Sequence, residues 1–193
     1  MKIETRIIQG SKGAIDRKDI REHLRAVCFD FDADCNKLSI IGTNAQVMIV
    51  NTIIIKDESD ITFCKKYFSD NSAYFFDNVV FDKRDIFAEF NEIDGQLACN
   101  GTILKRLEQS YPNWKCVVPH EKMKKASIYC GFNADLIKQI DKALGWKFMI
   151  ITHTPCVSGN LDANDERLSP HRWDLNIYDN CDTIVVCMPM RLD

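Results

Sequence analysis

The chain has 193 residues, of which 46% are hydrophobic and 27% are charged, a composition typical of a globular protein with one large domain or two modest ones. Its formal net charge of −3 excludes a general electrostatic attraction to nucleic acid, so contact with DNA would need a local basic surface. No apolar run has the length of a membrane span and no signal peptide is evident, which favours a reducing, cytoplasmic location.

Cysteines and histidines do not follow the patterns of metal sites or disulfide frameworks. The nine cysteines are scattered without a C-x-x-C pair, and their odd number favours free thiols. Cys28, Cys130 and Cys187 lie in apolar, strand-like runs, where cysteine behaves as a small hydrophobe. The four histidines lack metal-ligand spacing. We therefore expect no metal site and no cofactor.

The first half of the chain has the composition of a set of antiparallel strands. Short runs of β-branched and aromatic residues are separated by Gly, Asn and Asp, which tolerate turn conformations. Asp94-Gly95 and Asn100-Gly101 are strong hairpin signals. The pattern predicts strands at residues 2–9, 26–31, 37–42, 46–55, 61–67, 73–81, 86–90, 96–100 and 102–107.

Residues 16–25 form a charged segment between the first two predicted strands. Ile20 and Leu24 stand four positions apart, which predicts a short helix or turn with one apolar stripe. A solvated surface and a nucleic-acid contact are both consistent with the charges. The basic residues of this window are Lys12, Arg17, Lys18, Arg21 and Arg25.

Residues 111–119 form the segment against which the segments before and after it are expected to pack. Pro112 and Pro119 each fix φ and lack an amide hydrogen, so this run is predicted to leave a strand as a stiff connector. Such a connector joins two packed units and leaves its apolar side chains at the junction. A surface loop with two unrelated prolines is the alternative.

The second half contains the one segment with a clear helical pattern. Residues 134–144 place their apolar side chains on one face, after a capping Asn133 and before Gly145. Lys138 and Lys142 stand four apart on another face, where an external anion or the neighbouring aspartates would relieve their repulsion. The remaining predictions are a basic linker at 120–125, strands at 127–132, 146–152, 173–178 and 183–188, and a polar loop at 155–172.

A Met-Pro-Met run lies near the end of the sequence given, at residues 188–190. Two methionines around a proline supply an adaptable apolar surface that suits a peptide-binding site. Packing of this tail against the core is the other interpretation.

Four segments in the same order resemble the bacterial DNA polymerase III beta subunit, the replicative sliding clamp. Tyr-Pro-Asn-Trp-Lys-Cys-Val-Val-Pro (111–119) resembles the family's Phe-Pro-Asp-Tyr-Arg-Arg-Val-Ile-Pro, and Met-Pro-Met-Arg-Leu (188–192) its C-terminal ending. Residues 19–27 and 42–48 are similar to the family's Asp-Val-Arg-Tyr-Tyr-Leu-Asn-Gly-Val and Ala-Thr-Asp-Gly-His-Arg-Leu segments. Each match is weak alone, whereas four in order over most of the chain are a specific signal.

The resemblance implies an α+β, DNA-clamp-like fold of antiparallel β-sheets with few helices packed on one side. It also implies a clamp middle-domain-like unit at residues 1–119 and a half-domain at 120–193 that resembles the C-terminal part of a clamp. Among the family's phosphate-contacting helices, only 134–144 is expected to be preserved. A reduced DNA-facing surface would comprise Arg17, Lys18, Arg21, Arg25, Lys138 and Lys142.

The family's best-known activity is the capture of short peptide motifs in an apolar pocket. The pocket departs from the family where Gln46-Val47 replaces a His-Arg pair and Cys116 replaces the second connector arginine, so it loses cationic rim groups. Carried onto matching positions, the pocket comprises Thr43, Ala45, Val47, Met48, Pro112, Cys116, Val117, Val186, Met188, Pro189 and Met190.

The leading interpretation is therefore a non-enzymatic processivity or tethering factor of DNA replication, from a phage or mobile element. Its partners would be a DNA polymerase or other proteins with clamp-binding motifs, and double-stranded DNA if it forms a homo-oligomeric ring. The alternative is a monomeric adaptor or decoy that binds such peptides without encircling DNA. An enzyme is not expected, because no paired carboxylates, nucleophile motif or phosphate loop stands out.

Overall fold

The computed structural model of the chain describes residues 1–79, 81–82, 85–118, 134–145, 153–155, 171–178 and 181–187. No helix within these residues is both long and apolar enough to cross a membrane. The helices are α1 Thr5–Gly13, α2 Glu58–Tyr67 and α3 Ala134–Leu144, with 3-10 turns η1 Glu22–Leu24 and η2 Trp114–Cys116. The strands are β1 Lys2–Glu4, β2 Val27–Asp32, β3 Lys37–Thr43, β4 Val47–Ile54, β5 Ser72–Phe75, β6 Phe87–Ile93, β7 Gln96–Cys99, β8 Thr102–Ile103, β9 Lys105–Arg106, β10 His153–Pro155, β11 His171–Tyr178 and β12 Cys181–Cys187.

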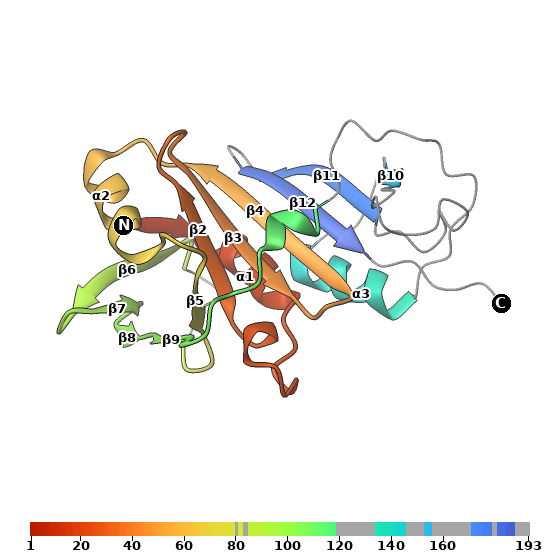
Figure 1. Cartoon of the computed structure of the whole chain (residues 1–193), viewed down its shortest axis with the longest axis horizontal. Coiled ribbons are helices and arrows are strands. Elements are labelled where there is room, and N and C mark those ends of the chain that lie inside the picture. The colour runs from red at the N-terminus through yellow and green to blue at the C-terminus, as the bar shows by residue number, and fades with distance from the viewer. Residues whose placement is uncertain are drawn as a thin grey trace.

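The strands form two antiparallel sheets, an eight-stranded one in the order β10-β11-β12-β4-β3-β2-β5-β9 and a four-stranded one in the order β1-β6-β7-β8 (Figure 1). The expected α+β class with antiparallel sheets is confirmed. Strand β12 pairs with β4 over its whole length, with Val186 opposite Met48 and Cys187 opposite Val47. Strands from before and after residue 119 therefore belong to the same sheet. The division of the chain into two units at that position stays a prediction.

The two faces of the eight-stranded sheet are covered by different elements. Because successive strand residues point to opposite faces, Val47 and Ile49 pack with α3, whereas Met48 and Val50 pack with Tyr111 and Trp114. In Figure 1, α1 and α3 lie behind the sheet and the segment with η2 passes in front of β4 and β12. The expected packing of helices on one side is thus observed.

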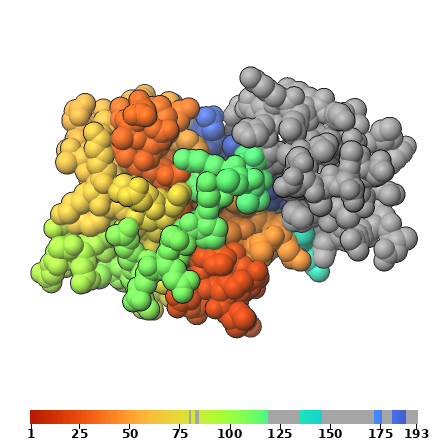
Figure 2. Space-filling view, in the orientation of Figure 1, coloured from red at the N-terminus to blue at the C-terminus, as the bar shows by residue number. Residues whose placement is uncertain are grey.

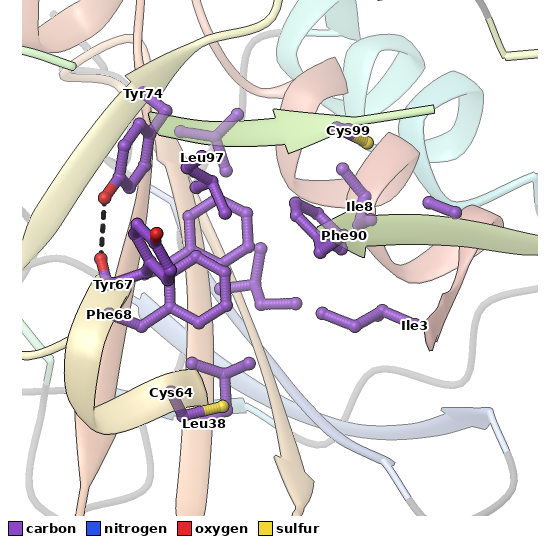
Figure 3. Packing of buried hydrophobic residues seen from close by; sticks show 14 of the residues in the cluster. Ile3, Ile8, Leu38, Cys64, Tyr67, Phe68, Tyr74, Phe90, Leu97 and Cys99 are labelled. Atoms are coloured by element: carbon purple, nitrogen blue, oxygen red, sulfur yellow. Dashed lines mark hydrogen bonds between the residues drawn. The ribbon is translucent and has the colours of Figure 1, made fainter. Parts of the chain in front are cut away.

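The largest core cluster fills the space between the two sheets and is rich in aromatic rings. Phe29 of β2 stacks on Phe68 with ring centroids 4.6 Å apart, and Phe90 of β6 meets Phe68 edge to face at 5.8 Å. Tyr74 of β5 donates a hydrogen bond of 2.7 Å to the carbonyl of Tyr67, at the end of α2 (Figure 3). Offset and edge-to-face contacts of this kind stabilise cores beyond the burial of area alone.

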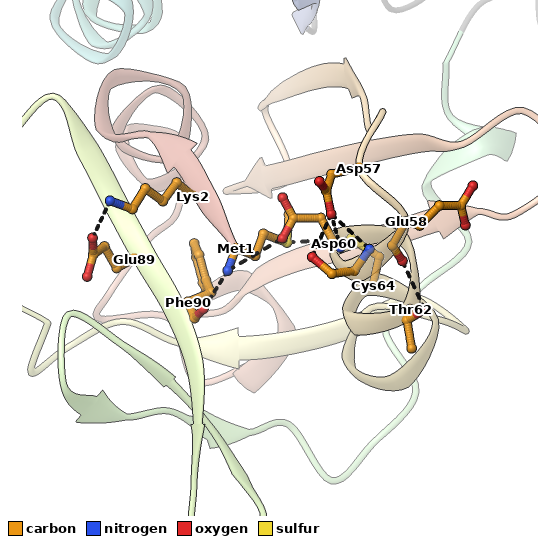
Figure 4. Close-up of polar contacts among 10 residues, drawn as sticks. Met1, Lys2, Asp57, Glu58, Asp60, Thr62, Cys64, Glu89 and Phe90 are labelled. Carbon is orange, nitrogen blue, oxygen red and sulfur yellow. Dashed lines mark hydrogen bonds and ion pairs between the residues drawn. The ribbon is translucent and has the colours of Figure 1, made fainter.

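Strand β1 is held in the small sheet by polar contacts at its N-terminal end (Figure 4). The Met1 ammonium donates to the carbonyl of Phe90 at 3.0 Å and lies 3.5 Å from a carboxylate oxygen of Asp60. Lys2 pairs with Glu89 across the two strands at 2.7 Å. These contacts connect the small sheet to the first turn of α2.

A buried polar network connects α1 with strands β3, β4 and β12. Asn51 donates to the carbonyl of Ile7 and to the hydroxyl of Ser11, both at 3.0 Å, and accepts a 2.7 Å hydrogen bond from Thr183. Ser11 in turn donates to the carbonyl of Ile40 at 2.8 Å. Because buried polar groups need hydrogen-bond partners, this network fixes the position of α1 on the sheet and the register of β12 with β4.

The strand predicted at 2–9 is confirmed for residues 2–4 and wrong beyond them, since the chain leaves β1 after Glu4 and forms α1. Ile7, Ile8 and Ser11 are buried at helical spacing, and the helix lies so close to β3 that a Cβ at Gly42 would lie 1.8 Å from the carbonyl oxygen of Ser11. Tertiary packing therefore overrides the weak local preference of this segment.

The strand predicted at 61–67 is also wrong, because these residues belong to α2. The carboxylate of Asp57 caps the helix by accepting from the amides of Ser59 and Asp60. Ile61 and Cys64 then share the buried face. Other boundaries differ less: the strand predicted at 73–81 ends at Phe75, the run 102–107 divides into β8 and β9, and residues 16–25 contain only η1. The predictions at 120–125, 127–132 and 146–152, and most of 155–172, lie outside the described residues.

Candidate functional site

The connector that begins at Tyr111 lies on the sheet face opposite α1 and α3. Tyr111 and Trp114 are buried, with 5% and 9% of their surfaces exposed, and pack against Met48 and Val186. The edge of the His23 ring meets Tyr111, with centroids 6.4 Å apart and planes at 90°. In Figure 2 this green segment crosses the visible face of the molecule between orange and yellow surfaces.

An apolar pocket of about 250 Å³ opens between the connector, the β3–β4 turn and η1. Among the described residues that line it there is no carboxylate, ammonium or guanidinium group. Such a surface suits an apolar side chain from a ligand better than a charged one. The lining residues are His23, Leu24, Thr43, Ala45, Gln46, Val47, Met48, Tyr111, Pro112, Trp114, Val117 and Val186.

The β3–β4 turn that forms one wall of the pocket is fixed by its own side chains. Asn44 accepts hydrogen bonds from the amides of Gln46 and Val47 at 3.0 and 2.8 Å, and Thr43 donates to the carbonyl of Val47 at 2.8 Å. Ala45 has φ of 72°, a left-handed conformation that such local hydrogen bonds stabilise. The Asn44 side chain also donates to Gln139 of α3 at 3.0 Å, so this wall is connected to the helix face.

The connector forming the opposite wall is held by a carboxylate on β2. Asp30, which is 8% exposed, accepts a 3.1 Å hydrogen bond from the indole Nε1 of Trp114. The same oxygen lies 2.8 Å from the ammonium of Lys115, which also sits 5.5 Å above the Trp114 ring. Asn113 caps η2 by accepting from the amide of Lys115.

Burial keeps two ionisable groups near the site, the Tyr111 phenol and the Cys28 thiol, in their neutral forms. Burial raises the pKa of the Tyr111 phenol and of the Cys28 thiol well above their usual ranges. Away from the site, in the core cluster between the two sheets, burial likewise raises the pKa of Cys64 and of Cys99 to about 12. These thiols therefore lack the thiolate character of a nucleophile or metal ligand at neutral pH.

The structure brings most of the predicted pocket residues together. Cys116 lies in η2 but is exposed and does not line the cavity. Met188, Pro189 and Met190 lie outside the described residues, although they follow Cys187, which pairs with Val47 beside the pocket. The predicted residues that do line the cavity are Thr43, Ala45, Val47, Met48, Pro112, Val117 and Val186.

The pocket predicted from the sequence lacks five residues that the structure places in its lining, namely His23, Leu24, Gln46, Tyr111 and Trp114. All five stand within the segments that carried the family resemblance. The available signal was their place in those segments, and Gln46 and Tyr111 also stand directly beside assigned positions.

Among the predicted DNA-facing residues, Arg25 lies on a different face of the large sheet from the two lysines of α3, and a common DNA-facing surface stays a prediction. Arg25 lies 5.7 Å above the ring of Phe75, which packs with the connector-side cluster, and lines a cleft of about 240 Å³ with Lys105. Lys138 and Lys142 belong instead to α3, on the opposite face.

The remaining basic positions are exposed or paired. Arg17 and Lys18 are exposed in the loop after α1. Arg21 pairs with Asp19 at 2.8 Å, and its guanidinium contributes most to lowering the pKa of that carboxyl. No cluster of three or more His, Cys, Asp or Glu side chains capable of holding a metal ion occurs in the described ranges.

Solved structures with a similar fold include bacterial sliding clamps. The beta subunit from DNA polymerase of Streptococcus pyogenes matches 100% of this chain and 66% of its own, with a TM-score of 0.62 and 12% identity. The DNA polymerase III beta chain of Streptococcus pneumoniae matches 100% of this chain and 64% of its own, with a TM-score of 0.61 and 13% identity. The beta clamp of Helicobacter pylori in complex with diflunisal matches 99% and 66%, with a TM-score of 0.57 and 11% identity.

At such identities the likeness is one of fold, and the chain spans about two thirds of the length of these clamps. No protein-family model and no curated protein matches the sequence. The resemblance inferred from the four sequence segments is thus confirmed at the level of the three-dimensional structure.

Proposed function

We propose, from the premise that the chain has the fold of a bacterial replicative sliding clamp, that it is a non-enzymatic, clamp-like replication factor that captures short peptide motifs in the pocket between its connector and the β4–β12 strand pair. The observation that carries this proposal is the convergence of four parts of the chain, 23–24, 43–48, 111–117 and Val186, on one apolar cavity. They are separated by long stretches of sequence, yet each belongs to or immediately precedes a segment that resembles the clamp family.

The chemistry of the cavity supports a peptide ligand rather than a reaction. Its walls are apolar and fixed by the Asn44 turn and the Asp30–Trp114 contact, so a ligand side chain enters a preformed site. Preformed walls reduce the ordering that binding requires. Binding energy in such interfaces comes from one or two buried anchors, here an aliphatic or aromatic side chain of the partner.

The direct test is binding of a labelled peptide that carries the clamp-binding motif of a bacterial replicative polymerase, measured by fluorescence anisotropy. We expect Val117→Asp to weaken binding at least about tenfold, because it places a carboxylate at the cavity wall. Val117 is 52% exposed, so the fold should tolerate the change. Ile54→Asp is the matched control, since Ile54 is 58% exposed at the far end of β4. Equal binding by both variants, or no binding by the wild-type protein at high concentration, would exclude the proposal.

Small aromatic probes provide an independent test. The beta clamp of H. pylori has been solved in complex with diflunisal and with 3,4-difluorobenzamide. Both compounds carry fluorine, so binding to this protein can be followed by 19F NMR. We expect the motif peptide to displace a bound probe from the wild-type protein.

Tethering to DNA would require a ring, and the separation of Arg25 from the two lysines of α3 favours the second candidate, a monomeric adaptor or decoy. Sedimentation and retention on DNA distinguish the two. A processivity factor should form oligomers of one size and remain on circular but not on linearised DNA. A monomer that binds the peptide and is not retained on either DNA is the adaptor. Its origin in a phage or mobile element and its cytoplasmic location stay predictions from the sequence.

A further inference from the structure

The connector-side face of the large sheet changes from apolar to polar along its strands. Ala26, just before β2, and Cys28 of β2 belong to the apolar cluster, whereas Asp30, the next residue on the same face, does not. On the neighbouring strand Ser39, which pairs with Asp30, makes a 3.1 Å hydrogen bond with Thr52 of β4. The connector therefore lies across a boundary between an apolar surface and a short polar strip.

Trp114 spans this boundary, and the side chain of Asp30 accepts the hydrogen bond that orients its ring. Its ring packs in the apolar cluster, while its only polar atom, Nε1, donates to Asp30 at 3.1 Å. A buried indole N–H needs a partner, and Asp30 is the partner on β2, 84 residues away in sequence. This hydrogen bond selects the ring orientation in which Trp114 forms a wall of the cavity.

We propose that Asp30 is the positioning residue of the peptide pocket: its carboxylate fixes the Trp114 ring, and thereby keeps the pocket open and preformed before a ligand arrives. This inference rests on the proposed function of the pocket. Asp30 does not line the cavity, so it acts through Trp114 and not by touching the ligand.

The contact with Lys115 contributes less to this positioning than the indole hydrogen bond. The Lys115 side chain is 57% exposed, and ion pairs of exposed lysines are weakened by solvent and salt. Its backbone amide is already held by Asn113. The acceptor oxygen of Asp30, more than its charge, is therefore the feature that matters.

Three variants separate these contributions. Asp30→Asn keeps an acceptor for the indole N–H and removes the charge, Asp30→Ala removes both, and Lys115→Met removes the ion pair alone. Each is compared with the wild-type protein by acrylamide quenching of tryptophan fluorescence without peptide, and by anisotropy with the labelled motif peptide. Trp114→Phe identifies the part of the emission that belongs to Trp114, because Trp146 and Trp173 also emit.

We expect Asp30→Ala to increase quenching of the Trp114 emission and to weaken peptide binding about tenfold. Asp30→Asn and Lys115→Met should stay within about threefold of the wild-type affinity. Unchanged quenching and unchanged affinity in Asp30→Ala would overturn the inference, and so would a loss of affinity in Asp30→Asn equal to that in Asp30→Ala. Absence of peptide binding by the wild-type protein overturns the proposed function instead, and the quenching measurement still reports whether Asp30 positions Trp114. Thermal unfolding of each variant identifies one that fails to fold, in which case Asp30→Leu, which likewise removes both the charge and the acceptor, replaces Asp30→Ala.

Discussion

The two faces of the eight-stranded sheet differ in how completely they are covered. On the helix face, α1 and α3 pack so closely that a Cβ at Gly13 would lie 2.5 Å from the Cβ of Ala143. On the connector face, one irregular segment covers the strands and leaves a cavity of about 250 Å³. Adjacent residues of one strand thus pack against a helix on one side and line the proposed peptide pocket on the other.

Gly42→Ala should have the largest effect and tests the tight packing of the helix face. The new Cβ would lie 1.8 Å from the carbonyl oxygen of Ser11, so α1 would have to move away from β3. We expect the free energy of unfolding to fall by about 3 kcal/mol or more. Denaturant unfolding measures this, and Gly101→Ala, at a turn whose Cβ would meet nothing within 4 Å, is a milder comparison. An undiminished unfolding midpoint in Gly42→Ala would contradict the close packing.

The neighbouring residues Ile49 and Met48 provide the matched pair for the two faces. Ile49→Ala should lower the free energy of unfolding by about 3 kcal/mol and leave peptide affinity unchanged, because Ile49 packs with α3. Met48→Ala should cost about 1–2 kcal/mol of stability and weaken peptide binding about tenfold, because Met48 lines the pocket. Denaturant unfolding and anisotropy measure both effects in each variant. Equal effects of the two variants on affinity would remove the distinction between the faces.

Asn51→Leu tests the buried network that aligns β12 with β4. The change leaves the hydroxyl of Thr183 and the carbonyl of Ile7 without their hydrogen-bond partner. We expect a loss of about 2–3 kcal/mol in the free energy of unfolding. Peptide affinity at a temperature where the variant stays folded should be close to that of the wild-type protein. A variant as stable as the wild-type protein would show that the network contributes no net stability.

Alkaline pH should have a smaller effect on the helix side of the molecule. The pKa values of Cys64 and Cys99 are raised by burial to about 12, above those of thiols in the unfolded chain. The stability from keeping these groups neutral is fully present below pH 9 and is lost as the pH rises towards 12. Unfolding midpoints between pH 8 and 11 measure this loss, which should be smaller in Cys64→Ala. Midpoints with the same slope in both proteins would contradict it.

The elements that the sequence predicted well are those whose local pattern and tertiary environment agree. The helix at 134–144 was predicted with its observed bounds, because apolar spacing and the terminal Gly145 indicate the same structure. Strands β2, β3 and β4 were predicted to within two residues at each end, owing to their β-branched composition. Helices α1 and α2 were misread as strands, since Ile and Phe favour strands locally while their burial follows the spacing of a helix.

The pocket could be predicted only in part, for a similar reason. The resemblance to clamps was enough to assign Pro112, Val117 and the turn residue Thr43 to the pocket, because it consists of matches in short contiguous segments. The contact of Asp30 with Trp114 joins two residues 84 positions apart, and nothing in the local sequence of either one indicates the other. The position of Arg25 away from α3 likewise depends on how the chain folds around Phe75.

The most direct test of the central claim is to map a bound motif peptide onto the two faces by backbone amide NMR. We predict that chemical-shift changes and slowed amide exchange concentrate at residues 43–48, 111–117 and 184–186, while α1 and α3 stay unchanged. Changes confined to the α1 and α3 surface, or an absence of changes at saturating peptide, would contradict the assignment of recognition to the connector face.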